Sequence, residues 1–323
     1  MSSLALKGPY WVTVRQHRKA LWWTLGLAAV AVVALVTSRL WSDSAVAALR
    51  AAGCTVSSEN PTCFQPTRDY LDDQWNARHI VEYAAMGMLV LPGIVGAFVA
   101  GPMLARELES GTYKLAWTQS VTPTRWLAAK LAVPAALVLA GLPLLSLAFY
   151  WAWRTGPAHD YPTYWYEPNV FVSYGIVPVA HTLLGLALGA AVGLLVRRTV
   201  VAMSVTALIT GAALAVLAWL RAGLWPVKTI TGSSVDVSAS ADWRLDHGMV
   251  TATGERIRWG DCVVTPDVDA RQCMTARGGV AEFMDVHPAS HFWPLQLVET
   301  GICLAVAALA ILLAFRVLRR RHG

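Results

Sequence analysis

Six long apolar stretches are the feature that most constrains what this chain can fold into. A helix that crosses the hydrocarbon core of a membrane needs about 20 mostly apolar residues. Charged residues make up only 14% of the chain, against about 25% in soluble domains, so its apolar surface needs lipid as a solvent. We predict an all-α polytopic membrane protein, with one six-span domain over residues 1–323. The expected spans are 20–38, 83–104, 127–153, 171–196, 199–220 and 295–317.

The basic residues predict the orientation of these spans. With the N-terminus in the cytoplasm, every short cytoplasmic segment is basic and that side holds just two acids, Glu107 and Glu109, as the positive-inside rule requires. The opposite orientation would place Arg197 and Arg198 on the outer side. We therefore expect both chain ends in the cytoplasm and the protein in the cytoplasmic membrane. Residues 45–47 resemble a signal-peptide cleavage site, but the first apolar run is long for a signal peptide, and we expect it to be retained.

Two large segments, 41–82 and 221–294, are expected to be loops on the outer side. Residues 229–280 within the second are polar and strand-prone, with turn residues between the strand-like runs. This composition predicts a small extracytoplasmic region that contains β-strands. A short aromatic loop, TYWYEP, lies between the third and fourth spans on the same side.

Four of the five cysteines fall in the two outer segments, where an oxidising environment favours disulfides. Four cysteines allow three pairings. The sequential pairing, Cys54–Cys63 and Cys262–Cys273, requires the least loop closure; free thiols are the alternative. Cys303 falls in the last span, where a buried cysteine acts as an inert small hydrophobe.

The most informative cytoplasmic segment joins the second and third spans and reads ARELESGTYKLAWTQSVTPTRWLAAK over residues 105–130. Its start predicts a short helix that stops near Gly111, and Thr124 is placed to cap the next helix. Two acids amid basic segments are well placed to meet an arginine or lysine of a soluble partner. The alternative is a hairpin whose tryptophans lie in the lipid headgroup layer.

The sequence ELESGTYKLAWTQSVTPTRWLAAKL strongly resembles the corresponding loop of type-2 permeases of ATP-binding-cassette (ABC) transporters. Two other segments are similar to the same family: WVTVRQHRKAL before the first span and HFWPLQLVETGI before the sixth. Permeases of this type have six spans and cytoplasmic termini. The number and order of the spans resemble the family over the whole chain, whereas sequence motifs of the family are found in these three segments. Segments 41–82 and 221–280 are not matched.

In that family the acidic loop helix is a coupling helix, which rests in a groove of a separate ATPase subunit and passes its motion to the spans. The resemblance implies that Glu107 and Glu109 are ion-pair or capping partners in this contact. It also implies outer re-entrant helices over residues 281–294. The implied coupling residues are Arg106, Glu107, Glu109, Gly111, Trp117, Gln119 and Arg125. A connecting helix along the inner membrane face would include Arg15, Arg18 and Lys19.

The resemblance also implies the partners of an exporter subunit. ATP and magnesium would be bound by the partner ATPase, since this chain has no GxxxxGK[ST] phosphate loop, and no cofactor is expected on the chain itself. A second permease chain, identical or different, would complete the pathway within membrane lipid, and no nucleic acid is expected. The sequence leaves the exported substrate open among drugs, lipids, peptides and glycan precursors.

Motifs of other functions are missing from the sequence: it has no HExxH, GxSxG or paired-cysteine zinc pattern. We therefore expect no metal site and no enzymatic activity on this chain. His181 in the fourth span is either a functional group or a neutral histidine bonded to a neighbouring helix. Glu299, near the outer end of the sixth, is expected to cap a helix start or to pair with Arg221 or another cation. The alternative functions are a sensor or anchor whose region 221–294 binds an outer ligand, and a membrane enzyme acting on a lipid-linked substrate.

Overall fold

The structure is a computed structural model that describes Arg15 and residues 18–114, 122–154, 163–232, 242–262 and 269–322. The chain divides into two compact units, a helical one and a smaller one that contains the strands. The helices are α2 (Arg18–Ala51), α3 (Phe64–Ile94), α4 (Gly101–Ser110), α6 (Pro123–Arg154), α7 (Pro168–Phe171), α8 (Val177–Val196), α9 (Thr199–Leu220), α10 (Ala270–Ala276) and α11 (Phe292–His322). Shorter helical turns are η1 (Pro61–Cys63), η2 (Val95–Ala100), η3 (Arg221–Gly223), η4 (Trp259–Asp261) and η5 (Ala289–His291).

Six helical segments of the described chain are long and apolar enough to cross a membrane, which confirms the six predicted spans. They are Leu21–Ala51, Pro61–Ser110, Pro123–Arg154, Val177–Val196, Thr199–Gly223 and Ala289–Arg320. The protein is therefore a multi-pass membrane protein. The first two segments are longer than predicted: α2 alone has 34 residues, or about 50 Å of helix, whereas the hydrocarbon core is about 30 Å thick.

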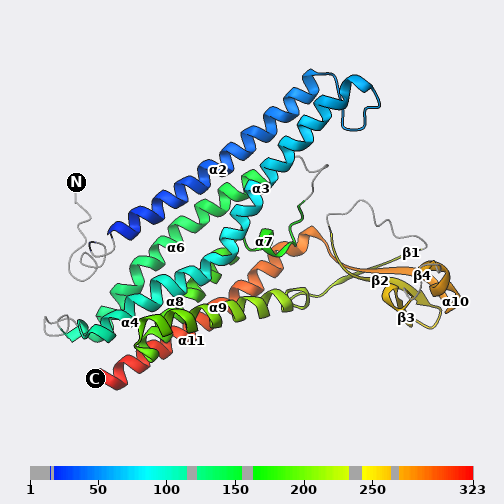
Figure 1. Cartoon of the computed structure of the whole chain (residues 1–323). Helices are drawn as coiled ribbons and strands as arrows, with labels where there is room; N and C mark the ends of the chain where they lie inside the picture. Colours follow the sequence, from blue (N-terminus) through cyan, green and yellow to red (C-terminus); the bar gives the residue numbers. More distant parts are fainter. Residues whose placement is uncertain are drawn as a thin grey trace, which may run out of the picture. The chain divides into compact units, whose positions relative to one another are not determined.

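The extra length forms a helical hairpin. Residues 41–82, expected to be an outer loop, are mostly helical, because α2 continues to Ala51 and α3 begins at Phe64. Figure 1 shows α2 and α3 lying side by side along this length, with a short turn between them. The turn starts at Gly53, whose φ of +68° is a backbone conformation that favours glycine.

Polar side chains hold the two helices of the hairpin together. The hydroxyl of Ser38 donates to the carbonyl of Ala77 at 2.7 Å. Ser42 donates from its hydroxyl to the side chain of Gln74 at 2.9 Å, and the amide of Gln74 donates back to the Ser42 carbonyl at 3.1 Å. All three polar side chains are buried, and a buried polar group is costly unless it is hydrogen-bonded. These bonds therefore fix the pairing of α2 with α3.

The second span runs without a break through α3, the π-helical turn η2 and α4, and packs closely against α8. Gly185, Gly189 and Gly193 recur every four residues and so share one face of α8. A Cβ at Gly193 would lie 2.8 Å from the carbonyl oxygen of Gly101, and one at Gly185 would collide with that of Pro92. These glycines let the two backbones touch, as the small residues of the fourth span predict.

The second unit contains a four-stranded antiparallel sheet among the described residues, in the order β1-β4-β2-β3. The strands are β1 (Lys228–Gly232), β2 (Trp243–Thr251), β3 (Arg256–Arg258) and β4 (Gly279–His287). The predicted β-strands of this region are thus confirmed.

The expectation of re-entrant helices over residues 281–294 is wrong. Residues 281–287, half of this segment, belong to β4, followed by η5 and the start of α11. The reason is that β4 is a central strand, hydrogen-bonded to β1 on one side and to β2 on the other. Its apolar Phe283, Met284 and Val286 are buried in this position.

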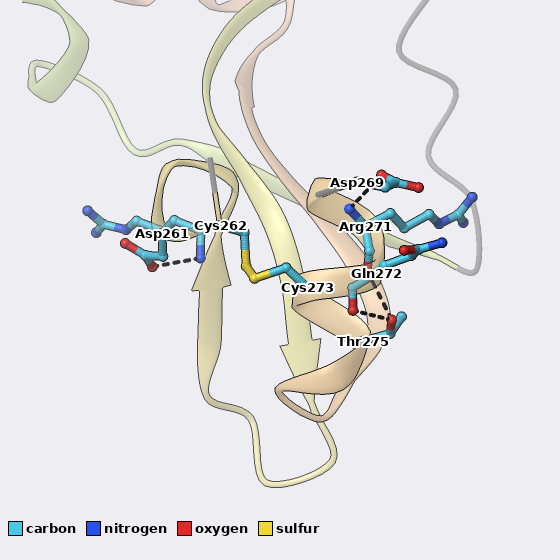
Figure 2. Close-up of a disulfide and its surroundings, with 8 residues drawn as sticks. Asp261, Cys262, Asp269, Arg271, Gln272, Cys273 and Thr275 are labelled. Atoms are coloured by element: carbon cyan, nitrogen blue, oxygen red, sulfur yellow. Dashed lines mark hydrogen bonds between the residues drawn. A yellow bond between two sulfur atoms is a disulfide. The ribbon is translucent and has the colours of Figure 1, made fainter. Parts of the chain in front are cut away.

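Both disulfides have the predicted sequential pairing, Cys54–Cys63 and Cys262–Cys273. The first closes the tip of the hairpin between α2 and α3. The second joins the residue after η4 to α10, as Figure 2 shows. Cys262 also packs in an apolar cluster with Met249, Ile257, Ala270 and Met274. Cys303 is buried and takes part in neither of these disulfides, as expected.

Candidate functional site

The acidic segment after the second span forms the helix α4 and a turn, which we call the elbow (Gly101–Lys114). Pro102 is the second residue of α4, just after η2 inside the continuous second span, where its missing N–H removes one helical hydrogen bond. Gly111 ends the helix with a φ of +73°, a conformation in which a side chain would be strained. Beyond it, the hydroxyls of Ser110 and Thr112 are hydrogen-bonded at 3.0 Å. The predicted short helix and its stop at Gly111 are both present.

Glu107 points from α4 to the start of α6. Its carboxylate accepts a hydrogen bond from the indole Nε1–H of Trp126 at 3.1 Å and another from the ammonium of Lys130 at 2.5 Å. The Lys130 side chain is only 6% exposed and that of Glu107 is 22% exposed. A charge buried to this extent is stable only when it is paired, so Glu107 supplies the counter-charge that Lys130 needs.

Glu109 is the next-to-last residue of α4 and points to the start of α9. One oxygen of its carboxylate accepts from the backbone N–H of Thr199 at 2.9 Å and from the Thr199 hydroxyl at 2.6 Å. Thr199 is the first residue of α9, whose first amides have no acceptor within their own helix. A carboxylate at this place also interacts favourably with the helix dipole.

The cationic side chains around the elbow are exposed. Arg106 lies on the other face of α4 from its buried residues, Lys114 follows the turn, and Arg125 lies in the first turn of α6. Arg198, directly before α9, is exposed as well. Trp117 and Gln119, which the resemblance included in the coupling loop, lie outside the described residues. The elbow therefore exposes two positive side chains and Glu109, while both of its carboxylates accept hydrogen bonds from other helices of the chain.

The expected connecting helix falls largely outside the described part of the chain. Arg18 and Lys19 are the first residues of α2 itself, and both are exposed. Arg15 is described and exposed, but its neighbours on either side are not described. A separate helix along the inner membrane face would have to lie before Arg18.

The two intramembrane ionisable residues have different surroundings. His181 is buried in α8. Glu299 is buried in α11 and forms an ion pair with Arg221, which lies directly after α9. Arg221 is thus the partner of Glu299, one of the alternatives that the sequence offered.

A pair of histidines lies near this ion pair along the chain. The Nδ1 atoms of His287 and His291 are 2.9 Å apart, and Nε2 of His287 is 2.9 Å from the carbonyl oxygen of Ala222. No group of three or more histidine, cysteine or acidic side chains with metal-binding geometry occurs within the described residues. The contacts of these histidines thus join β4 and η5 to the segment after α9.

Sequence reasoning identified the elbow but missed the residues that it binds. In the sequence, Lys130 is one of several basic residues on the predicted inner side, and Thr199 is the first residue of a predicted span. A signal for the first contact was present, because Lys130 lies three residues inside an apolar run that begins at Leu127. A buried lysine needs an acid, and the inner side offers just two. The contact of Glu109 with Thr199 spans 90 residues and leaves no local pattern.

Comparison with known proteins identifies the family. Residues 25–221 match the family described as "ABC-2 membrane transporter related". The match covers more than half of the chain, from the first span to the end of the fifth, and includes the whole elbow. No curated protein and no solved structure matches the chain. With six spans, an elbow after the second and a family match that covers five of the spans and the elbow, the chain belongs to the ABC-2 membrane transporter related family.

Proposed function

We propose that the chain is the transmembrane subunit of an ABC exporter, which forms the substrate pathway and couples it to a separate ATPase subunit. The single observation that carries this proposal is the elbow. It is a short helix directly continuous with the second span, bonded through Glu107 to α6 and through Glu109 to α9. A force applied to α4 therefore reaches three spans at once.

The remaining parts of the proposal follow from the resemblance and from the charges. The ATPase subunit holds ATP and magnesium, and this chain carries out no chemistry. A second permease chain completes the pathway, and the assembly lies in the cytoplasmic membrane with the elbow in the cytoplasm. Arg106, Lys114, Arg125 and Arg198 on the elbow side support this orientation under the positive-inside rule.

A crosslinking experiment tests the proposal. A photo-crosslinking amino acid is placed at the exposed Thr112 or Lys114 of the elbow, and the full chain is irradiated in its native membranes. We expect crosslinks to a second protein that has a GxxxxGK[ST] loop and that hydrolyses ATP when purified with the chain. Matched controls carry the same amino acid at the exposed Glu59 of the hairpin turn or at Thr253 of the strand-containing unit.

The pattern of crosslinks separates the alternatives. A nucleotide-binding partner captured from the elbow and not from Glu59 or Thr253 supports coupling. Absence of such a partner, or its capture from Glu59 instead, would exclude the proposal. A sensor or anchor would still have a partner at Thr253, and that partner would lack the phosphate loop.

A further inference from the structure

Both carboxylates of the elbow are already bound within the chain. Glu107 accepts hydrogen bonds from Trp126 and Lys130 of α6, and Glu109 accepts two from Thr199 of α9. Lys130 is the more buried partner of the first pair. If Glu107 moved to meet an arginine or lysine of another protein, Lys130 would be left buried with no counter-charge from it.

The positive side chains of the elbow are available instead. Arg106 and Lys114 are exposed on either side of Gly111, at the end of the chain segment that projects from the second span. Ser110 and Thr112 lie between them and are exposed too. Glu109 in the same stretch is exposed as well, but its carboxylate already accepts two hydrogen bonds from Thr199. The exposed side chains of the described elbow thus carry two positive charges and one negative charge.

We infer that Glu107 is a positioning residue, which acts through Lys130 to fix the elbow on α6, and that Arg106 and Lys114 carry the charge offered to the ATPase. This inference rests on the proposed function. It predicts that the groove of the ATPase that receives the elbow is acidic, the complementary charge for a cationic surface. Trp126 assists Glu107 by donating a second hydrogen bond to the same carboxylate.

A charge exchange tests the role of Glu107. Glu107→Lys places two ammonium groups next to each other in a largely buried place. Lys130→Glu places two carboxylates next to each other in the same place. The double variant restores a pair of opposite charges, with the lysine now on α4 and the glutamate on α6. The readout is the change in hydrogen exchange of α6 when ATP and magnesium are added to the purified complex. We expect this response to be lost in each single variant and recovered in the double variant.

A milder variant separates positioning from folding. Glu107→Gln keeps the size of the side chain and its ability to accept from Trp126, but removes the charge that pairs with Lys130. We expect the complex with the ATPase to form with unchanged affinity, while the response of α6 to ATP and magnesium falls. A merely structural role would lower expression and leave that response intact in the molecules that fold. Unchanged responses in Glu107→Gln would refute the positioning role, as would a double variant that fails to recover.

The second half of the inference has its own test. Arg106→Glu and Lys114→Glu reverse exposed charges that have no described structural role, so the chain should fold normally. Each is expected to weaken binding of the purified ATPase by about tenfold at low salt, and less at high salt. Thr253→Glu, an exposed change in the other unit, is the control. If ATPase binding is unchanged while binding of vesicles that contain anionic lipid falls, these cations bind the membrane surface. The assignment of Arg106 and Lys114 to the contact with the ATPase would then be wrong.

These results differ from a failure of the proposed function. If the wild-type chain binds no ATPase, the elbow is not a coupling site at all. If the wild-type chain binds the ATPase but Glu107→Lys weakens that binding as much as Arg106→Glu does, and Lys130→Glu does not rescue it, Glu107 contacts the partner directly. The function would then stand and the positioning role would be wrong.

Discussion

Arg221 and Glu299 form a buried bidentate ion pair, with Nε and Nη2 of the arginine 2.8 and 3.0 Å from the two carboxylate oxygens. Their side chains are 3% and 0% exposed. The two residues lie 78 positions apart, on the segments that enter and leave the strand-containing region. The pair thus closes this region at its base within the second unit.

Removing one charge of this pair should destabilise the protein strongly. Glu299→Gln leaves Arg221 buried without its counter-charge, and we expect a loss of about 3–5 kcal/mol in the free energy of unfolding. Thermal unfolding in detergent, followed by tryptophan fluorescence, measures the effect. The control is Arg258→Gln, which breaks an ion pair with Asp246 in which the side chains are 68% and 33% exposed; such pairs contribute about 0–1 kcal/mol. Equal effects of the two changes would contradict the burial of the Arg221–Glu299 pair.

The glycine face of α8 gives a second prediction. Gly185→Ala places a Cβ against the carbonyl of Pro92, and overpacking of this kind costs about 1–3 kcal/mol. Gly211→Ala in α9 meets no atom within 4 Å and should be neutral or slightly stabilising, because alanine favours helix. The unfolding temperatures of the two variants compare them directly. A lower temperature for Gly211→Ala than for Gly185→Ala would show that α8 does not pack in this way.

Loss of the hairpin disulfide should also lower stability. The double variant Cys54→Ser with Cys63→Ser removes a bridge over 9 residues, and closing a loop of this size contributes roughly 2–3 kcal/mol. Mass spectrometry of peptides from the unreduced protein provides the independent check on the pairing. We expect a peptide pair that joins residues 54 and 63, and a thiol at Cys303 that reacts only after unfolding. A peptide that links the hairpin to residue 262 or 273 would overturn the pairing.

The contact of Glu109 with Thr199 predicts a local effect. Glu109→Ala removes the acceptor of the first N–H of α9, so the first turn of that helix should exchange its amide hydrogens faster. Hydrogen exchange followed by mass spectrometry measures this for residues 199–202. Glu59→Ala, which removes an exposed acid elsewhere, should leave that exchange unchanged. Unaltered exchange in Glu109→Ala would show that the contact does not hold the helix start.

The spans could be predicted from the sequence because their signal is local. A run of apolar residues long enough to cross lipid is visible without any knowledge of its neighbours, and α9 begins and ends at the predicted residues. The outer ends of α2 and α3 were missed for the same reason. Beyond the apolar runs, these helix ends are held together by the hydrogen bonds of Ser42 with Gln74 and by a disulfide. A polar pair of helices of this kind contains no long apolar stretch that a sequence pattern could reveal.

The bonding partners of the candidate site could not be predicted, because they depend on tertiary contacts. Glu107 and Lys130 are 23 residues apart and lie on two different helices, α4 and α6. The strand β4 was missed because the strand-prone pattern ends at residue 280 and the resemblance suggested helices beyond it. Its residues 283–287 are all buried, so no polar–apolar alternation marks them in the sequence. Pairing with β1 and β2 on its two sides, a tertiary contact, makes this segment a strand.

The second span has a mechanical consequence. Its elements α3, η2 and α4 have 31, 6 and 10 residues and follow one another directly, which makes a continuous rod of roughly 70 Å. One end carries Glu107, the other is tied by Cys63, and the glycine face of α8 touches the rod between them. The contacts of this glycine face with the rod run from Pro92 to Ala105, close to Glu107. Pro92 and the π-helical turn η2 lie in the same stretch, and kinks in helices occur at such places. A tilt at Glu107 must therefore either carry α8 with it or bend the second span at η2.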